Sequence, residues 1–280
     1  MPLVTTDVLL APARDSGRGV GAFNVVQLEH AEAFVAAAER VGTGVVLQVS
    51  QNAVRYHGAL APVGAACLAL ARAAAAPVAV HLDHADDRDL VAEAVDLGFT
   101  SVMYDGSALS YDENVTSTAE VVRAAHAAGV VVEAELGEVG GKDGVHAPGV
   151  RTDPGEAAAF VAATGVDALA VAVGSSHAMT TRTAALDLDL IGRLHEAVEV
   201  PLVLHGSSGV PDEELVRAVR AGMTKINVST HLNGVFTRVV RERLGADPRL
   251  VDPRRYVGPA RDAVADEVAR LLRLLVGAAE

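Results

Sequence analysis

Eight short apolar runs recur along the chain, each separated from the next by a stretch with helical character, and this alternation constrains the fold more than any other feature. Most runs are continuously apolar, which is typical of parallel strands covered on both faces. The sequence therefore predicts an α/β protein. The expected strands are Val20–Phe23, Val45–Val49, Val78–Leu82, Ser101–Tyr104, Val130–Ala134, Ala168–Val173, Leu202–Leu204 and Lys225–Val228.

Helix start signals lie between several of these runs. Asp153 precedes Pro154 at the first position of an expected helix, and acidic residues follow Pro211 in a first turn. Eight strand–helix units with no linker rich in Pro, Gly or Ser favour a closed (β/α)8 TIM barrel over an open doubly wound sheet. We therefore expect residues 1–280 to form a single barrel domain with an additional C-terminal helix after Pro253.

The charge balance and the cysteine content exclude several classes of partner. The chain has 23 basic and 36 acidic residues, a net charge of −13, which repels nucleic acid but not a small phosphorylated molecule bound by local N–H groups. Cys67 is the one cysteine, in an apolar stretch, as expected for a buried thiol in a reducing compartment. Since Met1–Leu10 lack the basic start of a signal peptide and Arg72 interrupts the longest weakly polar tract, we expect a cytoplasmic protein with no membrane partner.

Histidines follow three of the expected strands at their carboxyl ends, where barrel enzymes place their chemistry. His84, His177 and His205 come from different strands and are expected to converge near the barrel axis. One histidine at a strand end is often only a hydrogen-bonded loop residue, but three imidazoles with an open fourth position are a ligand set of catalytic zinc. The pattern indicates a metal site.

A carboxylate and a further histidine accompany this cluster. Asp83 directly precedes His84, which puts an acid or base beside the expected metal, where it can move a substrate proton. Read alone, Asp83 would be a solvated or helix-capping residue, but within His81–His84 we favour the chemical role. His81 is interpreted as a residue that orients a ligand from behind it.

Two loops rich in hydrogen-bond donors follow the last two expected strands. One is Gly206-Ser207-Ser208-Gly209, and the other contains Asn227, Val228, Ser229 and Thr230. The corresponding loops of barrel enzymes form a recurrent phosphate site, and backbone N–H groups at glycines and helix starts are suitable donors. A further glycine-rich segment, residues 137–154, is expected to be a loop on the active face that acts as a lid.

Together these motifs resemble the class II, metal-dependent ketose-bisphosphate aldolases, the family of fructose- and tagatose-bisphosphate aldolases, and are nearest to the shorter tagatose type. The resemblance covers nearly the whole chain. It is carried by Ala22–Val25, Gln48–Ser50, His81–Ala85, Val132–Gly137, His205–Gly209 and Lys225–Thr230.

The resemblance implies a set of site residues. It implies one catalytic Zn²⁺ per subunit on His84, His177 and His205, Glu135 near an alternative metal position, and Asp83 as proton donor and acceptor. The substrate-binding candidates that follow from it are Asn24, Ser50, Ala178, Gly206, Ser207, Ser208, Asn227, Val228, Ser229 and Thr230.

The implied reaction is the reversible cleavage of a ketose 1,6-bisphosphate, fructose or tagatose, to dihydroxyacetone phosphate and an aldehyde such as glyceraldehyde 3-phosphate. It proceeds through a metal-stabilised enediolate while Asp83 takes the C4 hydroxyl proton. The alternative aldolase strategy, a lysine Schiff base, has only Lys142 and Lys225 as candidates, and Lys225 is expected to support the phosphate end.

Three positions depart from the family pattern. Ala178 and the three residues after it replace a Gly followed by an aromatic residue and a Lys, and Ser207 stands where Gly or Ala is usual. In the glycine-rich loop, Asp143 stands near the place of a Glu thought to move the C3 proton, and we expect it to substitute with a shorter reach.

Two other functions stay open at this point. A zinc hydrolase on the same barrel would not need the two phosphate loops, and a non-catalytic relative would bind a sugar phosphate without cleaving it. The identity of the ketose and any dependence on a monovalent cation are also open. The resemblance implies a homodimer or homotetramer.

Overall fold

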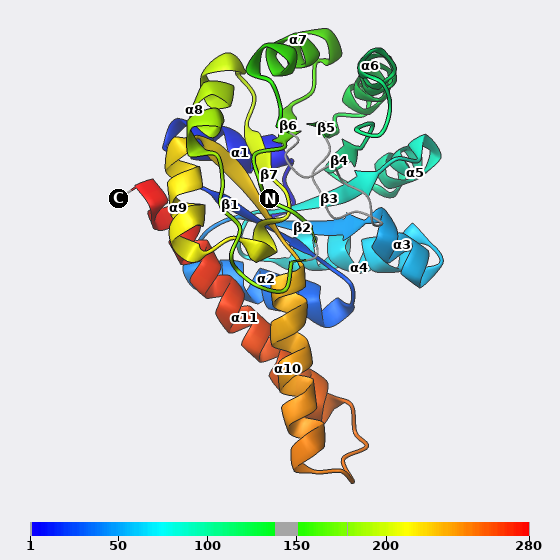
Figure 1. Ribbon diagram of the computed structural model, residues 1–280. Helices are drawn as coiled ribbons and strands as arrows, with labels where there is room; N and C mark the ends of the chain where they lie inside the picture. Colours follow the sequence, from blue (N-terminus) through cyan, green and yellow to red (C-terminus); the bar gives the residue numbers. More distant parts are fainter. Residues whose placement is uncertain (1, 138–150, 178, 280) are drawn as a thin grey trace.

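The structure is a computed structural model that describes residues 2–137, 151–177 and 179–279 (Figure 1). Its eight parallel strands form a closed barrel in which each strand pairs with the next and β8 pairs with β1. The expected (β/α)8 barrel is therefore confirmed. The strands are β1 Val20–Asn24, β2 Val45–Ser50, β3 Val78–Ala85, β4 Ser101–Tyr104, β5 Val131–Leu136, β6 Ala168–Val171, β7 Leu202–Leu204 and β8 Met223–Val228.

Helices follow the strands and surround the barrel (Figure 1). The expected start at Asp153 is present, because its side chain accepts hydrogen bonds from the N–H groups of Gly155 and Glu156. The helices are α1 Thr6–Asp15, α2 Leu28–Val41, α3 Gln51–His57, α4 Leu60–Ala73, α5 Arg88–Leu97, α6 Tyr111–Ala127, α7 Pro154–Thr164, α8 Leu188–Ala197, α9 Asp212–Ala221, α10 Thr230–Ala246 and α11 Arg254–Val276, with short 3₁₀ helices at Ser207–Gly209 (η1) and Gly277–Ala279 (η2).

The apolar core has two parts. Small side chains such as Ala22, Ala79 and Ala170 fill the interior of the barrel, and Leu10 of α1 covers its amino-terminal end. A larger layer packs between the strands and the surrounding helices, where the rings of Phe23 and Phe34 lie 5.3 Å apart. Because both faces of each strand are covered, the strands are continuously apolar except at the few polar positions described below.

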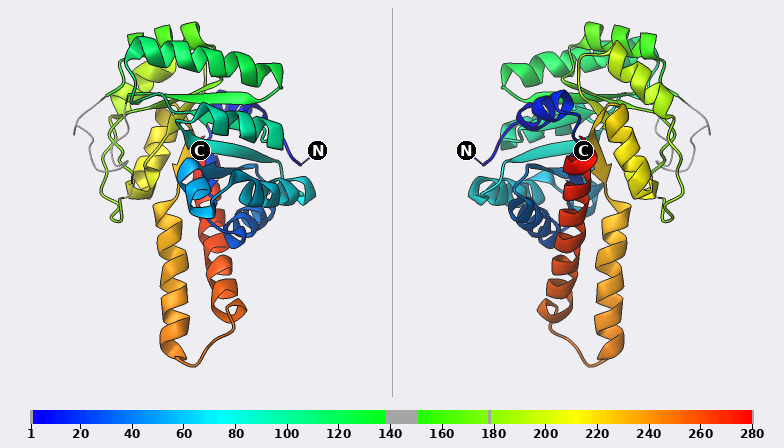
Figure 2. Two further views of the ribbon diagram at one scale, coloured as in Figure 1. Left: turned by 90° about the vertical axis from the view of Figure 1, so that its right-hand side faces the viewer. Right: turned by 90° about the vertical axis from the view of Figure 1, so that its left-hand side faces the viewer.

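The expected C-terminal helix is α11, which pairs with α10 to form a long antiparallel hairpin. Figure 2 shows this hairpin extending well beyond the barrel, with residues 247–253 at its tip. The inner half of α11 packs against α2 and contributes buried side chains such as Val264 and Leu272. Within the described residues no single helix has the length and apolar composition to span a membrane, although α3 and α4, bent by 115°, pass that test as a pair.

Candidate metal and substrate site

The end of β3 departs from regular strand geometry. Its pairing with β4 shifts register between Leu82 and Ala85, and His84 has a φ of 50°, in the left-handed region. Such a conformation costs about 1–3 kcal/mol in a residue other than glycine. In a regular strand neighbouring side chains point to opposite faces, but here Asp83 and His84 both line the same cavity. The irregularity therefore turns two adjacent polar side chains toward one site.

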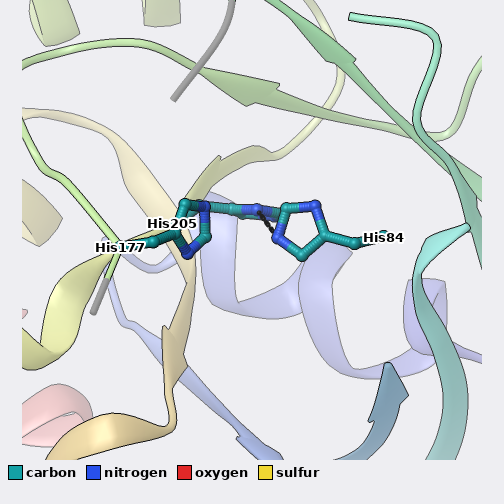
Figure 3. Close-up of side chains that lie close together, drawn as sticks. All are labelled: His84, His177 and His205. Atoms are coloured by element: carbon teal, nitrogen blue, oxygen red, sulfur yellow. Dashed lines mark hydrogen bonds between the residues drawn. The ribbon is translucent and has the colours of Figure 1, made fainter. Parts of the chain in front are cut away.

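Three histidines from different strands meet above the barrel. His84 is the second-to-last residue of β3, His177 follows β6 and His205 follows β7, and Figure 3 shows their rings facing one another. The centroid of the His84 ring lies 4.9 Å from that of the His177 ring and 4.3 Å from that of the His205 ring. One nitrogen of each ring lies within 4.8 Å of the others, which is a geometry suited to holding a metal ion.

Carboxylates hold two of these rings from behind. Nδ1 of His84 lies 2.9 Å from Oδ2 of Asp105, and Nε2 of His205 lies 2.9 Å from Oε1 of Glu133. Since a carboxylate only accepts hydrogen bonds, both of these ring nitrogens carry the hydrogen. The remaining nitrogens, Nε2 of His84 and Nδ1 of His205, lie at a hydrogen-bond distance of 2.7 Å from each other (Figure 3). When both rings are neutral, these two nitrogens carry the lone pairs, so the donor set fits a metal that binds both.

Glu135 lies directly beside the cluster. It is fully buried, and its Oε2 lies 3.5 Å from Nδ1 of His205 and 3.8 Å from Nδ1 of His84. His84, Asp105 and Glu135 form a second group with ligand atoms close enough for a metal. The site therefore offers a carboxylate position next to the three imidazoles.

Asp83 is a buried carboxylate whose two oxygens differ in their hydrogen bonding. Oδ2 accepts a hydrogen bond of 2.7 Å from Nδ2 of Asn24, whereas Oδ1 has no hydrogen-bond partner among the described residues. Burial alone would raise the pKa of Asp83, but the nearby His84 and His205 outweigh it, and with Lys225 they hold this pKa at about 2. Asp83 is therefore a carboxylate at neutral pH.

The cavity over these groups has a volume of about 320 Å³, at the lower end of the range for small-molecule sites. Most of its lining comes from the carboxyl ends of the strands and from the loops after them. The lining residues are Asn24, Ser50, Gln51, Asn52, Arg55, Asp83, His84, Asp86, Asp105, His177, Gly206, Ser208, Asn227, Ser229 and Thr230.

One side of the cavity is formed by the loops after β7 and β8. Gly206 has a φ of 68°, and a Cβ atom there would lie 2.6 Å from the carbonyl carbon of Ser176, so only glycine fits. The N–H of Ser229 donates to Oγ of Ser208, which joins the two loops. Asn227 is buried, and neither its Nδ2 nor its Oδ1 has a hydrogen-bond partner among the described residues. The amide nitrogen and oxygen of Asn227 therefore lie at the edge of the cavity, where a bound ligand can hydrogen-bond with them.

Three expected substrate contacts do not line the cavity. Lys225 is fully buried inside the barrel, where its Nζ donates a 2.6 Å hydrogen bond to Oε2 of Glu133, so the expectation that it lies at the phosphate end is not met. Its side chain points inward from the middle of β8 because of the strand's alternation. Ser207 donates its hydroxyl to the carbonyl oxygen of Leu204, and Val228 is also buried.

Three further residues expected at the site are His81, Asp143 and Ala178. His81, expected to orient a ligand, lies in the barrel interior with Nδ1 2.8 Å from Oγ of Ser101, and burial lowers its pKa to about 3. Asp143 and Ala178 lie outside the described residues, as does most of the expected lid at 137–154.

Sequence reasoning missed several polar residues of the site. Asp105 directly follows β4 and had the same signal as the other strand ends, a polar side chain after an apolar run. Glu133 lies within β5, and its pairing with His205 and Lys225 spans 72 and 92 positions of sequence. Gln51 and Asp86, which also line the cavity, directly follow β2 and β3, whereas Asn52 and Arg55 lie within α3 and had no strand-end signal.

Comparison with known proteins identifies the family. The family model described as fructose-bisphosphate aldolase class-II matches residues 4–280. The chain is 42% identical over 277 residues to the fructose-bisphosphate aldolase of Geobacillus stearothermophilus, covering 98% of this chain and 96% of that protein. It is 41% identical to the fructose-bisphosphate aldolase of Thermus caldophilus, covering 97% of each.

A solved structure agrees with this result. The crystal structure of the YdjI aldolase from Escherichia coli K12 superimposes with a TM-score of 0.87 at 30% sequence identity, covering 99% of this chain and 100% of that one. The chain therefore belongs to the class II fructose-bisphosphate aldolase family, as the sequence motifs indicated. It is an enzyme of the lyase class.

Proposed function

We propose that the protein is a zinc-dependent aldolase that reversibly cleaves fructose 1,6-bisphosphate to dihydroxyacetone phosphate and glyceraldehyde 3-phosphate, with tagatose 1,6-bisphosphate as the alternative substrate. The observation that carries this proposal is the three-histidine cluster beside Asp83, whose Oδ1 has no hydrogen-bond partner among the described residues. Relatives about 42% identical that are named fructose-bisphosphate aldolases support the choice of sugar.

His84, His177 and His205 would hold the metal, with Glu135 next to them as an alternative ligand. A zinc ion held there would polarise the ketose carbonyl and stabilise the negative charge that develops on its oxygen. Asp105 and Glu133 fix the orientation and the tautomers of the two histidines that they contact.

Asp83 is the proposed base in the cleavage direction. Its Oδ1 takes the proton of the C4 hydroxyl group, the C4–O bond becomes the carbonyl of the departing aldehyde, and the electrons of the C3–C4 bond remain on the dihydroxyacetone half, whose C3 then gains a proton to give dihydroxyacetone phosphate. In the condensation direction the same oxygen returns that proton to the aldehyde oxygen. The hydrogen bond from Asn24 to Oδ2 keeps Oδ1 directed toward the cavity.

The loops after β7 and β8 are the proposed site for the phosphate of dihydroxyacetone phosphate. Gly206, Ser208, Ser229 and Thr230 line one side of the cavity, and the two loops are joined by the bond between Ser229 and Ser208. Asn227 supplies a buried amide that lacks a hydrogen-bond partner among the described residues and faces this space. A zinc hydrolase would not need such a phosphate site, so this feature favours the aldolase.

Three wider expectations remain proposals. A single cysteine, Cys67, that is buried and free fits a reducing cytoplasm. The hairpin of α10 and α11 projects from the barrel with Leu244 and Val251 exposed, which supports assembly into a homodimer or homotetramer. We also propose that residues 1–280 act as one catalytic domain.

The test combines metal analysis of the purified protein with cleavage assays on fructose and tagatose 1,6-bisphosphates, with and without a chelator. The expected result is about one zinc per chain and chelator-sensitive release of dihydroxyacetone phosphate, faster from fructose 1,6-bisphosphate. Full activity after complete metal removal would overturn the proposal. Bound zinc without cleavage of either sugar would overturn the aldolase assignment and leave a sugar-phosphate-binding role.

A further inference from the structure

The side of the cavity formed by the loops after β7 and β8 carries neutral polar groups. Its described lining residues are Gly206, Ser208, Asn227, Ser229 and Thr230. A phosphate held there by backbone N–H groups, hydroxyls and an amide depends on where these donors lie, since no lysine or arginine among them supplies a long-range attraction. Whatever fixes the two loops relative to each other therefore affects how tightly a phosphate binds.

An ion network centred on Asp212 joins elements next to these loops. Asp212 is the first residue of α9, and its Oδ1 lies 2.6 Å from Nη2 of Arg182, in the loop after β6. Its Oδ2 accepts a 2.5 Å hydrogen bond from Nη1 of Arg270 on α11, and Nη2 of Arg270 donates to Oδ1 at 3.3 Å. One carboxylate therefore links the loop after β6 to helix α11.

Arg182 connects this network to the turn after β7. Its Nε and Nη2 donate to the carbonyl oxygen of Val210 at 2.9 Å and 2.6 Å, and Val210 directly follows η1, the turn that contains Ser208. The N–H of Ala184 donates to the carbonyl oxygen of Gly209 at 2.9 Å, which is another bond between the same two loops. The turn that carries Ser208 is thus held from the loop after β6.

Arg270 connects the network to the start of α10. Its Nη2 and Nε donate to the two oxygens of Glu267 at 2.7 Å and 3.0 Å, and Oε1 of Glu267 accepts a 2.7 Å hydrogen bond from Nε2 of His231. His231 directly follows Thr230, which lines the cavity. Burial would raise the pKa of Glu267, but the bonds from His231 and Arg270 outweigh it and hold this pKa at about 2, so Glu267 is charged at neutral pH.

We propose that Asp212 and Arg270 are positioning residues of the phosphate site, because they hold the turn after β7 and the start of α10 in the arrangement that brings their donors to one phosphate group. This inference rests on the proposed aldolase function. Neither residue is among the described residues that line the cavity. The side chains of the network are between 19% and 42% exposed, and charges that share partners in a partly buried network hold more firmly than an isolated surface pair.

The experiment compares wild type with Asp212→Asn and Arg270→Gln, each of which removes one charge from the network. Asp212→Glu retains the charge. The matched controls are Asp266→Asn and Arg40→Gln, which break an exposed 2.8 Å ion pair between α11 and α2, outside the described lining of the cavity. Binding of dihydroxyacetone phosphate is measured by calorimetry on the metal-loaded proteins. Values of kcat and KM are measured with fructose 1,6-bisphosphate.

Asp212→Asn and Arg270→Gln should each weaken the binding of dihydroxyacetone phosphate by about 3- to 10-fold. KM should rise by a similar factor while kcat stays within about 2-fold, because the loops hold the phosphate equally before and during bond cleavage. Asp212→Glu should recover part of the affinity. The double variant should lose less than the product of the two single losses, since both residues act through one contact. Both controls should match wild type.

Unchanged affinity for dihydroxyacetone phosphate in both variants would overturn the inference. A lower kcat with unchanged KM and affinity would also overturn it, because a merely destabilised protein loses active molecules but keeps the affinity of those that remain. So would an equal loss of affinity in the two controls.

Failure of the proposed function gives a different result. A wild type that binds dihydroxyacetone phosphate but does not cleave fructose 1,6-bisphosphate would overturn the proposed reaction, and the comparison of affinities would still decide the roles of Asp212 and Arg270. A metal-loaded wild type that does not bind dihydroxyacetone phosphate would overturn both the proposed phosphate site and this inference.

Discussion

The amide of Asn24 on β1 donates a 2.7 Å hydrogen bond to Oδ2 of Asp83 on β3. Gln48, on the strand between them, donates in turn to Oδ1 of Asn24 at 3.4 Å. This chain of amides crosses three neighbouring strands and fixes one oxygen of a buried carboxylate. The other oxygen, Oδ1, is left without a hydrogen-bond partner among the described residues, at the wall of the cavity.

Asp83→Asn should abolish most cleavage without releasing the metal. The amide has nearly the same shape but cannot accept the C4 hydroxyl proton, so we expect kcat to fall about 10²- to 10⁴-fold. Metal content by elemental analysis should equal that of wild type, because Asp83 is not among the three imidazole ligands. Near-normal turnover in this variant would exclude Asp83 as the base.

Asp105→Asn should weaken metal binding although Asp105 need not touch the ion. A neutral amide is a poorer acceptor for Nδ1–H of His84, so the ring is held less firmly and its other nitrogen is less basic. We expect roughly a 10- to 100-fold loss of affinity in competition with a chelator of known strength.

The matched control for this prediction is Asp167→Asn, which alters a second aspartate–histidine pair, with His126, at 2.8 Å on the outside of the barrel. Its metal affinity should equal that of wild type. His205→Ala should lose both metal and activity. Equal affinities in the Asp105 variant and wild type would show that His84 does not depend on its carboxylate.

Lys225→Met should destabilise the barrel strongly. Lys225 and Glu133 are a buried ion pair at 2.6 Å, and removal of the cation leaves a buried carboxylate uncompensated. Burial would raise the pKa of Glu133, but Lys225 and His205 outweigh it and hold this pKa below its usual range. We expect a loss of about 3–5 kcal/mol in the free energy of unfolding, measured in urea with chelator present.

The double variant Lys225→Met with Glu133→Gln should recover about half of that loss or more, because a neutral amide replaces the unpaired charge. Glu133→Gln alone is the companion measurement. If the double variant were less stable than Lys225→Met, shape and packing would account for the loss instead of charge.

His30 should make the protein less stable in mild acid. Burial lowers the pKa of His30 to about 4, and Nε2 of this ring has no hydrogen-bond partner among the described residues. The unfolded chain binds this proton near pH 6.5, so a fall in pH from about 6.5 to about 4 favours unfolding, and the effect ends below the folded pKa. Between pH 7 and pH 5 the expected loss is on the order of 1–2 kcal/mol.

His30→Asn tests this because the amide oxygen can still accept from the N–H of Val26 but does not titrate. Lost packing against Phe34 and Phe236 lowers the free energy of unfolding of the variant by the same amount at every pH. The further decrease in its free energy of unfolding between pH 7 and pH 5 should be smaller than that of wild type. The contributions of other titrating groups, such as His81, are the same in both proteins and cancel when the pH dependence of the variant is subtracted from that of wild type. Identical pH dependence of the urea midpoint in both proteins would contradict the assignment.

The barrel was predictable because its strands are short apolar runs with an unmistakable period. The ends of the strands were less predictable. The strand expected at Val78–Leu82 continues to Ala85, because His84 stays in the sheet through a local irregularity. The run Ala168–Val173 ends as a strand at Val171. Apolar content does not mark where hydrogen bonding between strands stops.

The three histidines could be foreseen from strand ends, because parallel strands of a barrel bring those ends together. The positions of Lys225 and Arg55 could not. Lys225 is buried because a partner on β5, Glu133, compensates its charge, and a pairing across 92 positions leaves no local pattern. Arg55 resembles any exposed helical arginine until α3 is seen beside the cavity.

His84 and His205 face each other across 121 positions of the chain. A cation shared by the two rings is therefore a reversible cross-link between the first and last parts of the barrel, and it can form only after both have come together. Bound at 100 times its dissociation constant, such an ion would add about 2.7 kcal/mol to stability. The free energy of unfolding should therefore rise with the concentration of free zinc, and fall to the value of the metal-free barrel when a chelator is added.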